Sequence, residues 1–97
     1  MREIIQLSVI MMRSPIRVGD ALENGGSVTT ASSEMMFMGR LLACLGDEAL
    51  CARHGRTTIA EGNASFPGKG GRPVAMHHHR CACGCRLLSS LQNVNIA

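Results

Sequence analysis

The sequence predicts a small, mainly β and irregular domain built from short strands and loops. Three observations lead to this prediction. The chain has 97 residues with two Phe and neither Trp nor Tyr, so it cannot build a core from large aromatic side chains. Eleven Gly and three Pro divide it into short pieces, and three of these pieces repeat one pattern. A domain of this size buries only about 60% of the surface that its unfolded chain exposes. We therefore expect a metal or a partner subunit to support the fold.

The repeated unit begins with Arg, continues with mainly apolar or small residues, and closes with a two-residue turn. Its copies span residues 13–26, 40–53 and 72–85, and their turns fall at Gly19-Asp20, Gly46-Asp47 and His78-His79. Four residues after each turn stands a polar or metal-binding side chain, namely Asn24, Cys51 and Cys83. Gly-Asp after a short apolar run such as "PIRV" or "LLACL" is typical of a turn that closes a short strand. The three copies predict rough three-fold symmetry.

Further turns are expected where Gly, Asn and Pro cluster, at residues 25–26, 62–63 and 67–71. The pieces between the turns are expected to be extended, over residues 27–30, 57–60, 74–77 and 86–89. Only the stretch "ASSEMMFMGRLLACL" has the Met, Leu and Ala content of a helix. Gly39 and the repeat argue against a helix there, so we predict little helix anywhere.

The stretch "MHHHRCACGC", residues 76–85, concentrates His and Cys in a chain that has four His and five Cys in all. An odd number of Cys fits a disulfide framework poorly and favours folding in a reducing compartment. In an extended strand, Cys81, Cys83 and Cys85 would share one face and compete for a single metal. His77 and His79 would share a face in the same way. The sequence "CARH", with Cys51 and His54, adds a C-x-x-H pair typical of zinc sites.

Several classes of function are poorly supported by the composition. The net charge of +3 is scattered and few aromatic side chains could stack on bases, so we expect no nucleic-acid binding. No stretch has the roughly 20 apolar residues that span a bilayer, so we expect no stable membrane insertion. The start "MREIIQLSVIMMR" lacks a signal-peptide cleavage site, and Met11 or Met12 is a hypothetical natural start. We predict an N-terminal extension over residues 1–12, poorly ordered, followed by one domain over residues 13–97.

Four stretches together resemble a PAAR-domain protein, the tip of the type VI secretion spike. They are "IRVGDALENGGSVTTAS", "GRLLACLGDEALCARHG", "IAEGN" and "GRPVAMHHHRCACGCRLLSSL", and the resemblance runs from about Ser14 to Leu91. The Pro-Ala-Ala-Arg tetrapeptide is not intact, and its places are held by "PIRV", "LLAC" and "PVAM". The resemblance implies a small cone with pseudo-three-fold symmetry. Its base would sit on a VgrG trimer, one chain per trimer, and its apex would hold one structural zinc ion.

The resemblance also implies a set of zinc ligands. The family pattern has three His and one Cys around the zinc, and many members carry His where this chain has Asn24 and an acidic residue where it has His79. If His79 supplies the missing imidazole, the predicted ligands are His54, His77, His79 and Cys83. Cys51 is the reserve ligand, with Cys81 behind it.

Other side chains near this set have plainer expected roles. Cys85 either covers the metal or pairs with Cys81, and His78 is expected either to face solvent or to fill space in the packing. Cys44 is expected to be a small buried apolar residue. Asp20 and Asp47 are expected to form turns by accepting backbone N–H groups.

The function implied by the resemblance is that of a non-enzymatic spike tip that sharpens the VgrG trimer for envelope puncture and can carry effectors. The protein would be made in the bacterial cytoplasm without a signal peptide and exported by the type VI secretion system into the medium or a target cell. Its base would offer strand ends near residues 27–30 and 86–89 for docking. The alternatives are a small zinc-dependent hydrolase or toxin-like enzyme, for which Glu61 is the only acidic residue near the cluster in sequence, and a zinc-ribbon binder of nucleic acid.

Overall fold

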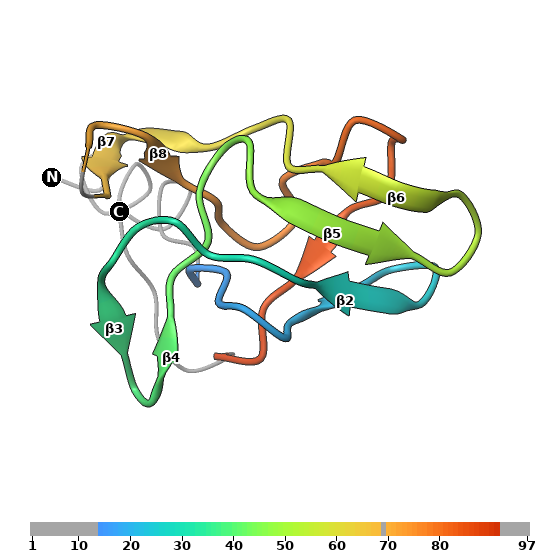
Figure 1. The fold of residues 1–97 in the computed structure, drawn as a ribbon, viewed down its shortest axis with the longest axis horizontal. Coiled ribbons are helices and arrows are strands. Elements are labelled where there is room, and N and C mark those ends of the chain that lie inside the picture. The colour runs from blue at the N-terminus through green and yellow to red at the C-terminus, as the bar shows by residue number, and fades with distance from the viewer. Residues whose placement is uncertain (1–13, 69, 92–97) are drawn as a thin grey trace, which may run out of the picture.

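The computed structural model describes residues 14–68 and 70–91, and this part of the chain contains short strands and irregular segments but no helix. Figure 1 shows the arrangement. The strands are β1 (Ala21–Leu22), β2 (Gly26–Val28), β3 (Met36–Phe37), β4 (Arg40–Leu41), β5 (Glu48–Cys51), β6 (Gly55–Thr58), β7 (Asn63–Pro67), β8 (Pro73–Val74) and β9 (Leu87–Leu88). The predicted mainly β and irregular fold is confirmed. The stretch whose composition suits a helix forms the hairpin β3–β4 instead.

Three hairpins form a closed ring. The main sheet has the order β6-β5-β2-β1-β9, with β1–β2 and β5–β6 as two of the hairpins. The third hairpin consists of residues 80–82 and β9, joined by a bridge between Arg80 and Arg86. The backbone N–H of Ala60 donates to the carbonyl of Arg80 at 2.9 Å, and that of Ala82 donates to Thr58 at 2.7 Å. Because these bonds join the third hairpin to the end of β6, the sheet closes on itself.

The three repeated units meet in a cyclic set of backbone hydrogen bonds. Ile16 donates its N–H to Ala75, Ala43 donates to Ile16, and Ala75 donates to Ala43, at 2.9, 2.8 and 2.9 Å. These three residues occupy equivalent positions in the repeat, and each is completely buried. Two small alanines allow the three backbones to approach closely around the axis. The predicted pseudo-three-fold symmetry is therefore a property of the backbone itself.

The two-residue turns repeat the same geometry. Gly19 donates its N–H to Val28, Gly46 to Ile59 and His78 to Leu87, each at 2.8 Å. The second central residue of each turn has a positive φ, 91° at Gly19, 91° at Gly46 and 73° at His78. Glycine adopts this conformation without a steric penalty, whereas the third copy holds a histidine in it.

Two apolar clusters fill the molecule. The larger lies inside the ring, and its buried members are Ile16, Leu22, Val28, Ala43, Ala49, Cys51, Ile59, Ala75, Cys81, Cys85 and Leu87. The smaller consists of Leu42, Cys44, Val74 and Met76, covered by Met35, Phe37 and Phe66. In Figure 1 the loop between β5 and β6 lies at one end of the molecule, and the hairpins β3–β4 and β7–β8 lie toward the other. The predicted extension over residues 1–12 lies outside the described residues.

Candidate metal centre

Three cysteines and one histidine gather at the turns of the second and third hairpins. Cys51 ends β5 and His54 stands in the turn before β6, while Cys83 lies in the turn of the third hairpin and Cys85 follows that turn. One ligand atom from each of these four residues lies within 4.8 Å of all the others. Cys51 and Cys85 are buried, Cys83 is half-buried and His54 is exposed. The cluster therefore lies near one end of the molecule, with its cysteines toward the core and its imidazole toward solvent.

The distances within the cluster fit a metal ion with a small adjustment. The Sγ atoms of Cys51 and Cys85 are 3.0 Å apart, and the His54 Nδ1 lies 3.3 Å from the first and 3.6 Å from the second. Zinc–sulfur bonds of about 2.3 Å place two tetrahedral sulfur ligands about 3.8 Å apart. The donors would need to separate by less than about 1 Å. Three thiolates and one imidazole are also a common ligand set of structural zinc, so these residues lie close enough to bind a metal ion and have suitable chemistry.

The thiols of the cluster differ in their protonation. A hydrogen bond donated by Cys85, together with a contact to His54 and nearby backbone N–H groups, lowers the pKa of Cys51 to about 6 against the opposing effect of burial. The same hydrogen bond raises the pKa of Cys85 to about 11. The contact between the two sulfurs thus favours a thiolate at Cys51 and a thiol at Cys85. A bound divalent metal would displace the remaining proton, because metal ligands must be deprotonated.

The other two cysteines are unlike those of the cluster. Burial raises the pKa of Cys81 to about 12, and burial also raises the pKa of Cys44. Both side chains are fully or almost fully buried thiols without a disulfide partner. Cys44 belongs to the smaller apolar cluster, as expected from its sequence neighbours. The sequence left open a disulfide between Cys81 and Cys85, and the structure has both as free thiols.

Of the four ligands predicted from the sequence, His54 and Cys83 lie in the cluster. His77 and His79 lie instead at the open end of the third hairpin, where the chain turns into it. The Nδ1 atom of His77 accepts the backbone N–H of Ser89 at 2.9 Å. The Nδ1 atom of His79 accepts the backbone N–H of Met76, also at 2.9 Å. The identity of the metal ligands stays a prediction.

The position of His79 follows from the repeat. In the equivalent turns, a carboxylate oxygen of Asp20 accepts the N–H of Arg17 at 2.8 Å, and one of Asp47 accepts the N–H of Cys44 at 2.7 Å. His79 makes the same bond in the third copy with an imidazole nitrogen. Asp20 and Asp47 thus form turns as expected, and His79 takes the place of an aspartate.

The sequence contained a signal for Cys51. It stands at the same position of the repeat as Cys83, four residues after its turn, so the two side chains approach the same axis from neighbouring hairpins. Cys85 follows Cys83 by two residues, but Gly84 between them has a φ of 98°, so the turn rather than a strand brings Cys85 to the cluster. The alternation of side chains that grouped His77 with His79 is interrupted between them, at His78, where φ is positive. The extended segment after His79 ends at the turn that contains Cys83.

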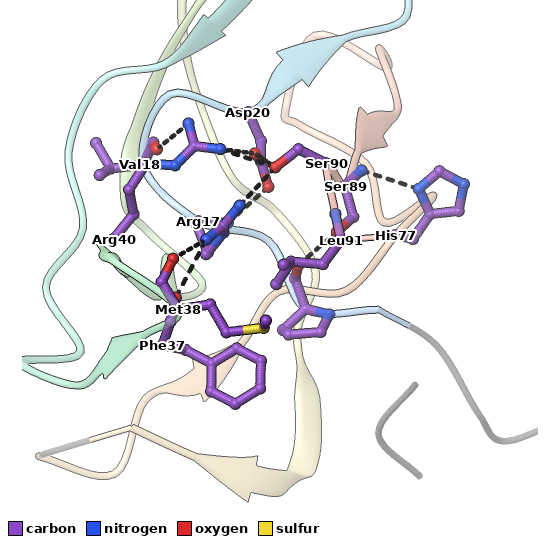
Figure 2. A network of polar contacts seen from close by, with 11 residues as sticks. Arg17, Val18, Asp20, Phe37, Met38, Arg40, His77, Ser89, Ser90 and Leu91 are labelled. Carbon is purple, nitrogen blue, oxygen red and sulfur yellow. Dashed lines mark hydrogen bonds and ion pairs between the residues drawn. The ribbon is translucent and has the colours of Figure 1, made fainter. Parts of the chain in front are cut away.

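A second polar network surrounds Arg17 (Figure 2). The buried guanidinium of Arg17 donates to the carbonyls of Phe37 and Met38 at 3.2 and 2.7 Å and to Ser90 Oγ at 2.9 Å. The Ser90 hydroxyl in turn donates to Asp20 at 2.6 Å. Arg17 therefore fixes the hairpin β3–β4 and the segment around Ser90 to the first repeated unit.

The hairpin that Arg17 holds is apolar at its tip. Met36 and Met38 are 68% and 66% exposed, and Leu50 on β5 is the third exposed large apolar residue in the described part of the chain. The turn residues Met38 and Gly39 have φ of 50° and 95°, as a tight two-residue hairpin turn requires. The tip is thus an exposed apolar turn.

Comparison with known proteins identifies one family. The family model described as the PAAR motif matches residues 18–89, which is most of the chain. Comparison with curated proteins gave no match. The described part of the chain has no helix with the length and apolar character needed to cross a membrane.

Proposed function

The chain belongs to the PAAR-motif family, whose members are structural proteins associated with type VI secretion spikes, and from this premise we propose that it caps a VgrG trimer. One chain would sit on one trimer, as a single tip. The observation that carries the proposal is the cyclic hydrogen bonding of Ile16, Ala43 and Ala75. A single chain with three equivalent arms around one axis can match three identical subunits, one arm to each.

We further propose that one structural zinc ion is held by Cys51, His54, Cys83 and Cys85. Four protein donors complete a tetrahedral shell and leave no position for a reacting water. Zinc would crosslink the turns of two hairpins at an end of the molecule where His54 is exposed and little apolar surface can be buried. This role suits a small domain whose core lacks large side chains.

The site supports a structural role better than a hydrolytic one. A catalytic zinc usually keeps an open position, with a carboxylate nearby to act on its water. Glu61, the carboxylate that the sequence suggests for this role, uses one oxygen to accept the backbone N–H of Arg80 at 2.7 Å. It thus helps to join the end of β6 to the third hairpin.

For the docking surface, the end of the molecule opposite the cluster is the better candidate. The strand ends expected near residues 27–30 and 86–89 are paired within the ring, Val28 with Ala49 and Leu87 with Leu22. Free strand edges are therefore not available at these residues. The ordered tip with Met36 and Met38 offers exposed apolar surface on a preformed hairpin instead, which reduces the entropy lost on binding.

Export of the protein by the type VI secretion system, envelope puncture and effector carriage follow from the same proposal. A tip bound to the spike would leave the bacterial cytoplasm with it and would reach the medium or a target cell. Effectors would travel either on this chain or on the spike below it.

The capping proposal is tested by mixing the purified protein with a soluble VgrG trimer. Light scattering after size-exclusion chromatography should give a complex of one chain per trimer. A trimer that carries three chains, or no complex at micromolar concentration, would overturn the proposal. Elemental analysis of the same protein should give one zinc per chain.

A further inference from the structure

We propose that Asn24 is a positioning residue of the metal centre, which holds the Cys85 sulfur in place by a hydrogen bond from its side-chain amide. The Asn24 Nδ2 lies 3.2 Å from the Cys85 Sγ. This inference rests on the proposed zinc site and adds to it the first hairpin, which contributes none of the four donors.

The repeat explains why this side chain reaches the cluster. Asn24 stands four residues after the first turn, as Cys51 and Cys83 stand after the second and third turns. The three hairpins form a closed ring, so side chains at this position approach one point from three directions. Two of them bring a sulfur, and the third brings an amide that donates to a sulfur.

The backbone holds Asn24 firmly beside the second hairpin. Gly25 donates its N–H to Leu22 at 3.0 Å and accepts the N–H of Ala52, also at 3.0 Å. A Cβ atom added at Gly26 would collide with the carbonyl oxygen of Leu50. The absence of a side chain at Gly26 therefore lets the two hairpins lie close together, and the turn that carries Asn24 is tied to the residue after Cys51.

The chemistry of the contact is that of an outer-shell partner. A neutral amide nitrogen does not ligate zinc, but its N–H can donate to a metal-bound thiolate. In the structure the Cys85 Sγ also lies 3.0 Å from the Cys51 Sγ, within hydrogen-bond distance, and metal binding would remove the proton of that bond. The amide of Asn24 would then continue to orient the Cys85 sulfur. Loss of such partners typically weakens metal binding about 10–100-fold.

The variant Asn24→Leu tests this role because leucine has a similar shape and no donor. Zinc affinity would be measured by competition with a chromophoric chelator, and the cobalt-loaded protein by absorption spectroscopy. We expect zinc binding to weaken about 10–100-fold. The thiolate-to-cobalt absorption should move to longer wavelength, because the sulfur lone pair is no longer stabilised by the N–H.

Asn63→Leu is the matched control, since it removes an asparagine that accepts the N–H of Ser65 on β7 and makes no bond to the cluster. It should leave zinc affinity and the cobalt spectrum unchanged. Asn24→Ala serves as the second variant should the leucine protein fail to fold. Wild-type affinity and an unaltered spectrum in the Asn24 variant would overturn the inference. Failure of the wild-type protein to bind zinc would instead overturn the proposed site.

Discussion

The imidazole of His79 accepts the backbone N–H of Met76 in the bond that Asp47 makes to Cys44 one repeat earlier. The two side chains differ in chemistry but hold the same turn. Since Nδ1 is the acceptor, the ring proton of neutral His79 is on Nε2. This relationship assigns His79 a structural role in the third arm.

We predict that His79→Asp keeps both the fold and the zinc, because aspartate restores the side chain that the other two turns use. His79→Ala should lower the free energy of unfolding by about 1–2 kcal/mol, since the N–H of Met76 loses its acceptor. Urea unfolding and zinc content would be measured on both variants. Loss of zinc from the alanine variant while it is still folded would show instead that His79 is a ligand.

His78→Gly is expected to stabilise the protein. His78 has a φ of 73° at a position where the other copies carry Gly19 and Gly46, and a residue with a Cβ is strained there by about 1–2 kcal/mol. The free energy of unfolding should rise by about 0.5–1 kcal/mol, because the greater conformational freedom of glycine in the unfolded chain offsets part of the relieved strain. Urea unfolding would measure this change. A destabilised variant would mean that the stacked rings of His77 and His78 contribute more than the strain costs.

Much of the fold could be predicted from the sequence because the three repeated units place their turns at equivalent positions. The repeat predicts turns at Gly19-Asp20, Gly46-Asp47 and His78-His79. The structure has a turn in each place, with its two central residues one position earlier, at 18–19, 45–46 and 77–78. Closure of the ring could not be predicted in this way, because it depends on bonds between Ala60 and Arg80 that no local pattern encodes.

The candidate site was harder to predict. It depends on where the chain stops being extended, because side chains alternate between the two faces only in an extended strand. His77, His79 and Cys83 share one face only if the chain stays extended from His77 to Cys83. The positive φ of His78 separates His77 from His79, and the turn at residues 82–83 separates His79 from Cys83. Cys51 and His54 could be grouped from their spacing. Cys85 could not be separated from Cys81 by spacing, because only packing buries Cys81 outside the cluster.

Substitution of a cluster cysteine should abolish zinc binding. Cys51→Ser and Cys85→Ser each remove one of four proposed donors, and serine is a poor zinc ligand. The matched control is Cys44→Ala, which removes a fully buried thiol outside the cluster. It should lower stability but keep one zinc per chain by elemental analysis. Full zinc content in both serine variants would contradict the proposed ligand set.

Removal of zinc should loosen the hairpin turns before the rest of the ring. After chelation, hydrogen exchange is expected to accelerate at the N–H of Ala52, near the cluster. The N–H groups of Ile16, Ala43 and Ala75 should stay protected, because they bond to one another in a buried apolar environment. Exchange measured by mass spectrometry on overlapping peptides would resolve the two regions. Equal acceleration in both would mean that the metal is required for the whole fold.

The double variant Met36→Ser/Met38→Ser is expected to weaken the proposed binding to the VgrG trimer without lowering the stability of the folded chain. Both side chains are largely exposed, so the folded chain alone loses little when they change. A preformed apolar protrusion buried at an interface contributes several kcal/mol, and the loss should be at least about 10-fold in affinity. Binding to the VgrG trimer would be measured by calorimetry.

Leu50→Ser is the matched control, because Leu50 is also exposed, at 48%, but lies on β5 outside the hairpin that Arg17 holds. If the control weakens binding and the double variant does not, the docking surface lies on β5 rather than on the hairpin β3–β4.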